Sequence, residues 1–226
     1  MNTKQLDRRG FLGVAGTVAA MGAITAAGAG QAAAPSGTVK ILGVACSSRR
    51  GMTTAKAVQA ALDAAGQVSP VIRTELMDLG GLRFTGWSGN DQPEDDFSPL
   101  LAKFRDPDVG GLIIGSPCYF RSMSSVCKAF IERLAPLRSP KMLLAEKALG
   151  VVAVGGFRNG GQELVISQIQ AAMLCFGMIA VGGHAPAFQG GTLLSANNSI
   201  DEDELGLKTA KMTGKHVAEA ALRARA

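Results

Sequence analysis

The sequence predicts one α/β domain in which helices cover both faces of a parallel β-sheet. Three observations lead to this fold class. Apolar runs alternate with helical patterns five times along the chain. The runs are apolar throughout instead of alternating with polar residues, which is typical of parallel strands buried on both faces. The 226 residues, 47% of them hydrophobic, suffice for one packed core, and no second domain or internal repeat is evident.

Five strands are expected, each a short apolar run that ends at a turn or at glycine. They span residues 38–45, 71–77, 109–115, 148–154 and 178–181. Because helical patterns separate them, the chain is expected to form successive βαβ units. Five strands fit a doubly wound sheet of order 2-1-3-4-5, in which ligands bind beyond the carboxyl ends of the strands.

Five helices are expected from apolar residues at helical spacing. They span residues 54–65, 97–104, 124–134, 161–176 and 201 to about 223. Three acidic residues at 94–96 favour a helix start at Phe97, because a helix N-terminus stabilises negative charge. The stretches 78–96 and 182–199, rich in Gly with Asp, Ser or Asn, are expected to form long loops.

The composition excludes several classes of function. The formal net charge is +5, but no run of five or six basic residues occurs, and one Trp and one Tyr leave few rings for base stacking. Nucleic acid is therefore not an expected partner. The four cysteines and two histidines show no CxxC, HxxxH or HExxH spacing, so no metal site is expected.

The N-terminus has the features of an export signal. Residues 8–12 read RRGFL, and residues 10–39 carry no charge. The segment 11–30 is too rich in Ala and Gly for a stable membrane span. This pattern resembles a twin-arginine signal, so we expect residues 1–34 to be the signal and residues 35–226 to be the periplasmic domain, which meets the membrane only through the export machinery. The alternative is an N-terminal anchor or a disordered tail.

The loop after the first strand has the composition of an anion site. Residues 46–53 read CSSRRGMT and open onto a helix, where hydroxyl groups, backbone N–H groups and the positive helix end converge. Arg49 or Arg50 adds a fork of donors suited to phosphate. The loop is neither a Walker loop nor a GxGxxG fingerprint. The alternative is an ordinary turn in which Thr53 is the helix N-cap.

The loops after the third and fourth strands indicate a flat ligand. Residues 115–124 read GSPCYFRSMS and place the chain's single tyrosine beside Phe120 at the ligand edge of the sheet. Residues 155–161 read GGFRNGG, and four glycines allow the backbone to approach a ligand closely. The alternatives are that one aromatic side chain packs on the core and that the glycine loop is flexible and binds nothing.

Together the loops resemble the NADPH-dependent FMN reductase and iron–sulfur flavoprotein group of flavodoxin-like proteins. The resemblance covers residues 40–183 and rests on VACSSRRGMTTAKAVQAAL, GGLIIGSPCYFRSMSSVCKAFIERL, and ALGVVAVGGFRNGGQE with CFGMIAVGG. It implies a flavodoxin-like three-layer sandwich that binds FMN at the strand ends. The implied FMN-binding residues are Ser47, Arg49, Thr53 and Thr54 at the phosphate, Pro117, Tyr119, Phe120 and Ser122 beside the isoalloxazine ring, and Gly155, Gly156, Phe157, Arg158, Asn159 and Gly160 at its other edge.

The resemblance also implies an activity. An exported FMN-binding oxidoreductase takes electrons from NAD(P)H and passes them through flavin N5 to a quinone, a flavin or another small acceptor. Because the flavin carries the redox chemistry, no catalytic side chain is expected. The periplasm lacks a nicotinamide pool, which favours as the alternative an electron carrier with another donor and a redox partner protein. Relatives often form oligomers, so a homo-oligomer is expected.

The sequence departs from the iron–sulfur members of the group after the second strand. Those members carry a compact cysteine motif there, whereas residues 79–96 contain no cysteine. An iron–sulfur cluster is therefore not expected. For Trp87, which lies in this segment, the alternatives are packing over the flavin, at a subunit contact, or on its own subunit.

Three residues have two interpretations each. Arg158 either stabilises negative charge on the reduced flavin or forms a salt bridge. Cys46 and Cys118 follow neighbouring strands, which lie about 4.8 Å apart, and disulfides span Cα distances of about 4.4–6.8 Å. The two cysteines therefore either form a disulfide or are small buried residues that line the site.

Overall fold

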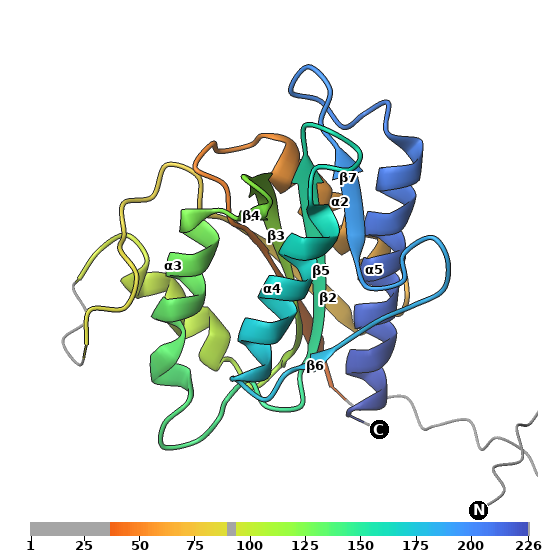
Figure 1. Ribbon diagram of the computed structural model, residues 1–226. Helices are drawn as coiled ribbons and strands as arrows, with labels where there is room; N and C mark the ends of the chain where they lie inside the picture. The colour runs from red at the N-terminus through yellow and green to blue at the C-terminus, as the bar shows by residue number, and fades with distance from the viewer. Residues whose placement is uncertain (1–36, 90–93, 226) are drawn as a thin grey trace, which may run out of the picture. The chain divides into compact units, whose positions relative to one another are not determined.

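The computed structural model describes residues 37–89 and 94–225, so the expected signal at residues 1–34 lies outside the described residues. Parallel strands form the centre of the fold in the order β2-β1-β3-β5-β6 (Figure 1). Their bounds are β1 Val39–Ala45, β2 Ile72–Asp78, β3 Val109–Tyr119, β5 Ala148–Gly155 and β6 Ile179–Ala180. The predicted α/β class with a parallel sheet is confirmed.

The expected number of strands is wrong at the edge of the sheet. The run at 178–181 contributes only the two-residue β6, which pairs with the start of β5. The chain then leaves the edge and returns as β7, Gly191–Leu194, which pairs in parallel with the end of β5. This strand falls in a stretch expected to be a loop. Within the described residues the sheet therefore has seven strands where five in the order 2-1-3-4-5 were expected, because β6 and β7 share the outer edge of β5 and the short strand β4 pairs with β3.

The third strand is also longer than expected. β1 ends beside Gly115, but β5 continues alongside β3 as far as Pro117. A proline is tolerated there because no strand on the β1 side needs its missing N–H. The chain then turns at Phe120 and Arg121, whose φ angles are +50° and +62°, and pairs antiparallel as β4, Ser122–Met123. Two successive positive φ angles are typical of the two-residue turns of β-hairpins.

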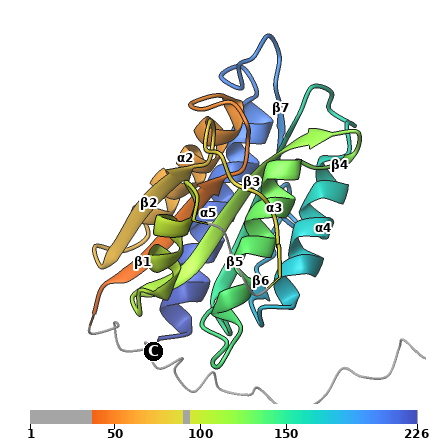
Figure 2. The same cartoon turned by 90° about the vertical axis from the view of Figure 1, so that its left-hand side faces the viewer.

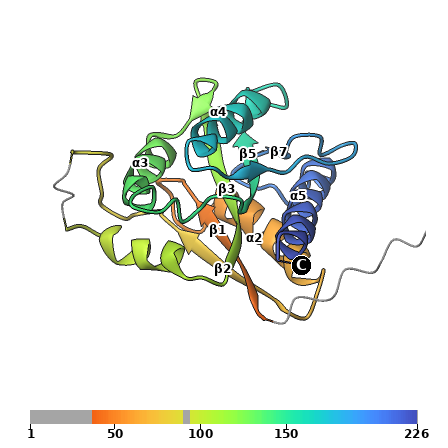
Figure 3. The ribbon, with the colours of Figure 1, turned by 90° about the horizontal axis from the view of Figure 1, so that it is seen from below.

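Helices cover both faces of the sheet, as Figures 2 and 3 show. On one face lie α2 Thr53–Gly66 and α5 Glu204–Arg223. On the other lie α3 Ser125–Arg133, the 3-10 turn η2 Ala135–Leu137, α4 Gln162–Leu174 and η1 Ser98–Arg105. No helix within the described ranges is long and apolar enough to cross a membrane.

The expected helix at 97–104 forms as the 3-10 helix η1 instead of an α-helix. Its start follows the acidic segment, and Oδ1 of Asp95 accepts hydrogen bonds from the N–H groups of Phe97 and Ser98. Asp95 also forms an ion pair with the buried Arg133 of α3. The short helix is therefore fixed to the domain by its N-terminal carboxylate.

Glycines let α2 and α5 lie close to the sheet and to each other. A β-carbon at Gly43 of β1 would lie 2.6 Å from side-chain atoms of Val58, and one at Gly115 of β3 would lie 2.3 Å from Val58 Cγ2. A β-carbon at Gly214 of α5 would lie 1.8 Å from the carbonyl oxygen of Ala61 in α2. The position of α2 over the sheet therefore depends on having glycine, without a side chain, at these three positions.

Replacing Gly115 with alanine tests this packing. The added methyl group overlaps Val58, so we expect the free energy of unfolding to fall by about 1–3 kcal/mol, the usual cost of overpacking a core. Urea denaturation followed by circular dichroism measures the change. Gly37→Ala is the control, because a β-carbon there meets no atom within 4 Å. Equal stability of the two variants would contradict the packing argument.

Candidate functional site

The carboxyl ends of the parallel strands bring four segments to one end of the domain (Figure 1). Three are the expected ligand loops: the β1–α2 loop at 46–52, the β3–β4 hairpin tip at 119–122 and the β5–α4 loop at 155–161. The fourth is the segment 195–203 between β7 and α5, where the sequence predicted a loop as far as residue 199 and a helix from residue 201, whereas α5 begins at Glu204. Parallel strands place these loops at one edge because all of them end there.

The β1–α2 loop is held by the carboxylate of Asp78. Its Oδ2 accepts from the N–H of Gly51 at 2.6 Å, and its Oδ1 accepts from the N–H of Gly80 at 2.9 Å. The Oγ of buried Ser47 accepts from the N–H of Arg49 at 3.2 Å. The end of β2 thus shapes the loop that carries two of the four expected phosphate residues, Ser47 and Arg49.

The N-terminus of α2 has the donor set that a phosphate requires. Its N-cap is Met52, with no side-chain hydrogen bond, so the interpretation of Thr53 as N-cap is wrong. The N–H groups of the first helical turn have no acceptor within the helix, since the bond from Lys56 N–H to Met52 O is the first of the ladder. Thr53 and Thr54 are buried at this end. Free N–H groups at a helix N-terminus are an arrangement that binds anions such as phosphate.

The four residues expected beside the flavin ring do not share one environment. Tyr119 is 43% exposed, and Phe120 is fully exposed at the hairpin tip. Pro117 is buried within β3 instead of standing in a loop. The Oγ of Ser122 donates to Oε1 of Gln168 in α4 at 3.0 Å, so this hydroxyl group is occupied by the helix. The two aromatic rings remain available to a flat ligand.

Hydrogen bonds to neighbouring segments hold both ends of the glycine loop. The carbonyl oxygen of Gly155 accepts from the N–H of Ser195 at 2.8 Å. The carbonyl oxygen of Gly160 accepts from the Cys118 thiol at 3.0 Å. Between these points, Phe157 is 80% exposed, and a β-carbon at Gly156 would meet nothing within 4 Å. The loop therefore presents open backbone at its centre and is fixed at its ends.

Arg158 forms a salt bridge, the second of its two interpretations. It pairs with Asp203, whose side chain is buried and caps α5 by accepting from the N–H of Gly206 at 3.0 Å. The other oxygen of Asp203 accepts from the N–H of Leu194 at 2.6 Å. Burial alone raises the pKa of Asp203, but these hydrogen bonds from Arg158 and the two backbone groups outweigh it and hold the pKa below its ordinary value of 3.8.

Arg49 also has a partner that the sequence did not predict. Its Nη1 donates to Oδ1 of Asn198 at 2.8 Å. Asn197 and Asn198 have φ angles of +49° and +60° and form the tip of a turn closed by a bridge between Ala196 and Ser199. The Asn-Asn pair is the one sequence signal that indicates this turn, because asparagine tolerates positive φ.

Gln162 is a buried residue beside the glycine loop that was not expected in the site, although it stands in the GGFRNGGQE string. Its Nε2 donates to the carbonyl oxygens of Phe157 at 2.7 Å and Leu193 at 3.2 Å, which links the glycine loop to β7. Its Oε1 is buried and has no partner among the described residues. Two carbonyl acceptors fix the orientation of the amide, so the orphaned oxygen is not explained by exchanging O and N.

Of the two interpretations of Cys46 and Cys118, the disulfide is wrong, because the four cysteines are free. The Cys118 thiol faces Gly160 instead. Cys46 is buried beside Cys127 of α3, and burial together with the Cys127 thiol raises its pKa well above 9.0. Cys46 is therefore a protonated core residue and not a reactive thiol.

Trp87 lies beside α3. Its backbone N–H donates to Oε2 of Glu132 at 2.9 Å, and its side chain is 47% exposed. It borders a groove with Ile131 and Met142, between α3 and α4 and away from the glycine loop. Its place beside α3 and away from the glycine loop does not support packing over the flavin of its own chain, whereas packing on its own subunit and a subunit contact both stay open.

An uncapped helix N-terminus, two exposed aromatic rings and an open glycine loop lie at one end of a doubly wound α/β domain, an arrangement suited to a flavin nucleotide. Comparison of the sequence with family descriptions matches residues 39–192 to the NADPH-dependent FMN reductase family. The chain belongs to this family, and FMN is its cofactor. It is an FMN-dependent oxidoreductase with a flavodoxin-like fold.

Individual relatives agree with this assignment. The chain is 37% identical over 191 residues to an iron–sulfur flavoprotein of Methanocaldococcus jannaschii, covering 80% of this chain and 96% of that protein. It is 28% identical over 144 residues to an NAD(P)H dehydrogenase (quinone) of Paracoccus denitrificans, covering 57% of this chain and 69% of that protein. The solved structure of RosB with a bound riboflavin-phosphate intermediate superposes with a TM-score of 0.65 at 16% identity, over 81% of this chain and 79% of that one, and so shows a shared fold.

Replacing Asp203 with asparagine tests the ion pair with Arg158. A folded-state pKa below 3.8 means that the carboxylate contributes stability that is complete above this pH and is lost as the pH falls through the lowered value. We expect the variant to lose roughly 1.5–3 kcal/mol of unfolding free energy at pH 7, because a charged hydrogen-bond partner is removed. The deficit shrinks in acid, where the native carboxylate also becomes neutral.

Urea denaturation between pH 7 and pH 3 measures this difference. Asp201→Asn is the matched control. Asp201 is exposed, and its Oδ2 lies 3.7 Å from Nζ of Lys56 in a surface ion pair, which contributes little to stability. A deficit in Asp203→Asn that stays constant down to pH 3 would show that its carboxylate charge does not stabilise the fold.

Replacing Gln162 with leucine tests the support of the glycine loop. The variant loses the bonds from Gln162 to Phe157 and Leu193, so we expect the FMN dissociation constant to rise by up to about thirtyfold, since two hydrogen bonds of about 1 kcal/mol each are removed. Quenching of flavin fluorescence on titration measures the constant. Gln59→Leu, at an exposed position of α2, serves as control. Unchanged affinity in Gln162→Leu would contradict a role in FMN binding.

Proposed function

We propose that this chain is an exported FMN-dependent oxidoreductase that takes electrons from NAD(P)H and delivers them to a quinone, a flavin or another small acceptor. One observation carries the proposal. The uncapped N-terminus of α2 lies at the same end of the sheet as the exposed ring of Phe120 and the open backbone at Gly156. A phosphate site, aromatic surface and open backbone are the parts that FMN requires.

The residues of the chain bind and orient, and the cofactor supplies the electron transfer. FMN, when bound, accepts a hydride equivalent and passes on electrons. The first turn of α2, with Ser47 and Arg49, holds the phosphate, and the β5–α4 loop offers backbone groups to the ring. No described side chain is needed as an acid or base. Asp203 neutralises Arg158, so the pair adds little net charge beside the ring.

Two features support a small-molecule donor and acceptor. Tyr119 and Phe120 on the hairpin and Phe157 on the glycine loop leave aromatic surface exposed where a second flat molecule approaches. The relative in Paracoccus denitrificans is called an NAD(P)H dehydrogenase (quinone), which supports a pyridine nucleotide as donor and a quinone as acceptor.

Export to the periplasm is part of the proposal and rests on the twin-arginine pattern at residues 8–12. A periplasmic location favours a second candidate function, an electron carrier with a non-nicotinamide donor and a redox partner protein. The same exposed rings suit a partner surface as well as a small molecule. We further propose a homo-oligomer, by analogy with the family.

The visible spectrum of the purified exported form tests the proposed activity. We expect a yellow protein whose flavin bands bleach when NADPH is added without air and return when a quinone follows. Fractionation of cells that produce the full chain, with Arg8 and Arg9 replaced by lysine as control, tests export.

Other outcomes decide between the candidates. A yellow protein that dithionite reduces and NADPH does not would establish the electron carrier in place of the reductase. A colourless protein that takes up no added FMN would contradict both functions. Equal periplasmic amounts of the native chain and the lysine variant would contradict twin-arginine export.

A further inference from the structure

The segment 195–203, between β7 and α5, contacts two of the loops at which FMN binding is expected. The N–H of Ser195 donates to the carbonyl oxygen of Gly155 in the glycine loop at 2.8 Å. Further along, Oδ1 of Asn198 accepts from Nη1 of Arg49 in the β1–α2 loop at 2.8 Å. Figures 1 and 2 show the segment at the same end of the domain as the β1–α2 loop. The segment therefore connects the two loops across the site.

Asn198 stands at the tip of a turn that the backbone holds in place. The N–H of Ala196 donates to the carbonyl oxygen of Ser199 at 2.9 Å, and the reverse bond is 2.8 Å long. The φ angles of Asn197 and Asn198 are +49° and +60°, as in the two-residue turns of β-hairpins. Ile200, directly after the turn, is buried. Asn198 is thus exposed to solvent while its backbone is fixed to the domain.

The same turn lies beside the N-terminus of α2. Arg49, which Asn198 binds, precedes the N-cap Met52 by three residues. Oδ2 of Asp201 lies 3.7 Å from Nζ of Lys56, which belongs to the first turn of α2. These two contacts, before and after the helix start, place the segment along the end of α2 whose N–H groups suit a phosphate.

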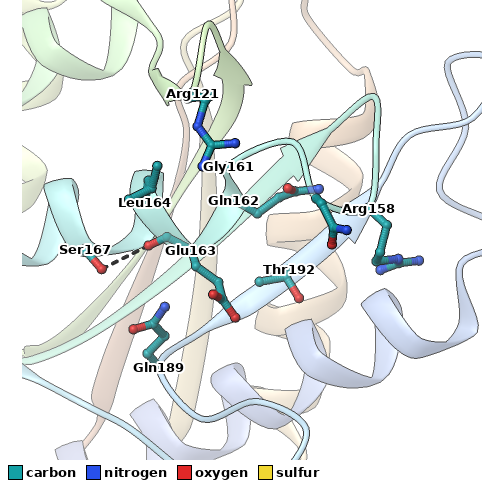
Figure 4. A pocket seen from close by; sticks show the side chains of 10 residues that line it. Arg121, Arg158, Gly161, Gln162, Glu163, Leu164, Ser167, Gln189 and Thr192 are labelled. Carbon is teal, nitrogen blue, oxygen red and sulfur yellow. Dashed lines mark hydrogen bonds between the residues drawn. The ribbon is translucent and has the colours of Figure 1, made fainter.

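Among the described residues, four arginines belong to the loops at this end of the domain, and their partners differ. Arg158 forms an ion pair with the buried carboxylate of Asp203, which neutralises it. Arg121 lines a polar cavity beside the N-terminus of α4 (Figure 4), and the described residues that line this cavity include none of the β1–α2 loop. Arg50 donates through Nε to a backbone carbonyl beyond the end of β2. Arg49 is therefore the arginine whose guanidinium is held beside the start of α2.

An amide holds a guanidinium without cancelling its charge. Asparagine is neutral, and its oxygen accepts from one of the five N–H donors of an arginine. The remaining N–H groups still offer a phosphate a fork of donors. A free arginine side chain loses its mobility when it binds a phosphate, and this loss weakens binding. Asn198 removes part of that cost, because Arg49 is already ordered before a ligand arrives.

We infer that Asn198 is a positioning residue of the FMN site, which holds the guanidinium of Arg49 for the phosphate. The inference rests on the phosphate site of the proposed function and adds a residue to it. The match to the FMN reductase family ends at residue 192, so the family description does not reach Asn198. Because Asn198 acts through Arg49, its effect is expected on FMN and not on riboflavin, which lacks the phosphate.

Titration of FMN and of riboflavin into the flavin-free full chain, followed by flavin fluorescence, tests the inference. Asn198→Gly removes the amide and keeps a residue that adopts the positive φ of the turn. We expect the FMN dissociation constant to rise about three- to tenfold, the cost of ordering one long side chain, and that of riboflavin to stay unchanged. Asn197→Gly is the matched control, because it makes the same substitution at the neighbouring positive φ and leaves the bond to Arg49 intact.

Asn198→Asp separates positioning from a structural role. Aspartate tolerates the same positive φ and accepts a stronger bond from Arg49, so the fold is not weakened. Its charge, however, neutralises Arg49 as Asp203 neutralises Arg158. We therefore expect FMN to bind at least as weakly to this variant as to Asn198→Gly, although urea denaturation gives an unfolding free energy no lower than that of the native chain.

A double-mutant cycle completes the test. In an Arg49→Gln background we expect Asn198→Gly to have no further effect on FMN, because the two residues act as one unit. Four results overturn the inference: unchanged FMN affinity in Asn198→Gly, equal weakening of riboflavin, native FMN affinity in Asn198→Asp, or a full effect of Asn198→Gly without Arg49. If the native chain binds FMN in these cases, the proposed function stands. A native chain that binds neither flavin contradicts both.

Discussion

The close approach of α2 to the sheet is the constraint on which the site depends. Gly43 and Gly115 have no side chain that would push Val58, and with it α2, away from the sheet. Gly214 likewise lets the backbone of α5 contact that of α2. Because α2 lies flat over β1 and β3, its uncapped N-terminus emerges directly beyond the end of β1. A helix N-terminus binds an anion only within about one turn, so a small lift of α2 would remove the phosphate site.

A second constraint joins the loops to the edge of the sheet. Asp203 binds Arg158 of the glycine loop, the N–H of Leu194 in β7 and the N–H of Gly206 in α5. Gln162 repeats the connection from the other side through Phe157 and Leu193. The late strand β7 is therefore more than an edge strand, because its backbone anchors the glycine loop through Gln162 and Asp203. The same connection directs Arg158 toward a carboxylate and away from a role as a free positive charge.

The segment after β2 is held in place by contacts with α3. Relatives that are named iron–sulfur flavoproteins align with most of this chain, yet its residues 79–96 contain no cysteine. Here the segment is fixed by the ion pair of Asp95 with Arg133 and by the hydrogen bond from Trp87 to Glu132. Both contacts end on α3. Ionic contacts with a neighbouring helix thus hold the loop against the body of the domain.

The sequence by itself determined the α/β class, the parallel strands, most helix positions and the three loops at the strand ends. The spacing of apolar residues and the glycine content, which indicate these features, can be read from short stretches of sequence. Tertiary structure alone decided the rest. β7 is four residues long and forms because β5 has an unpaired edge, which no local pattern records. The partners of Arg49 and Arg158, and the orphaned oxygen of Gln162, arise between segments distant in sequence. Residue types therefore indicated what the loops bind, whereas only packing decided which side chains remain free to bind it.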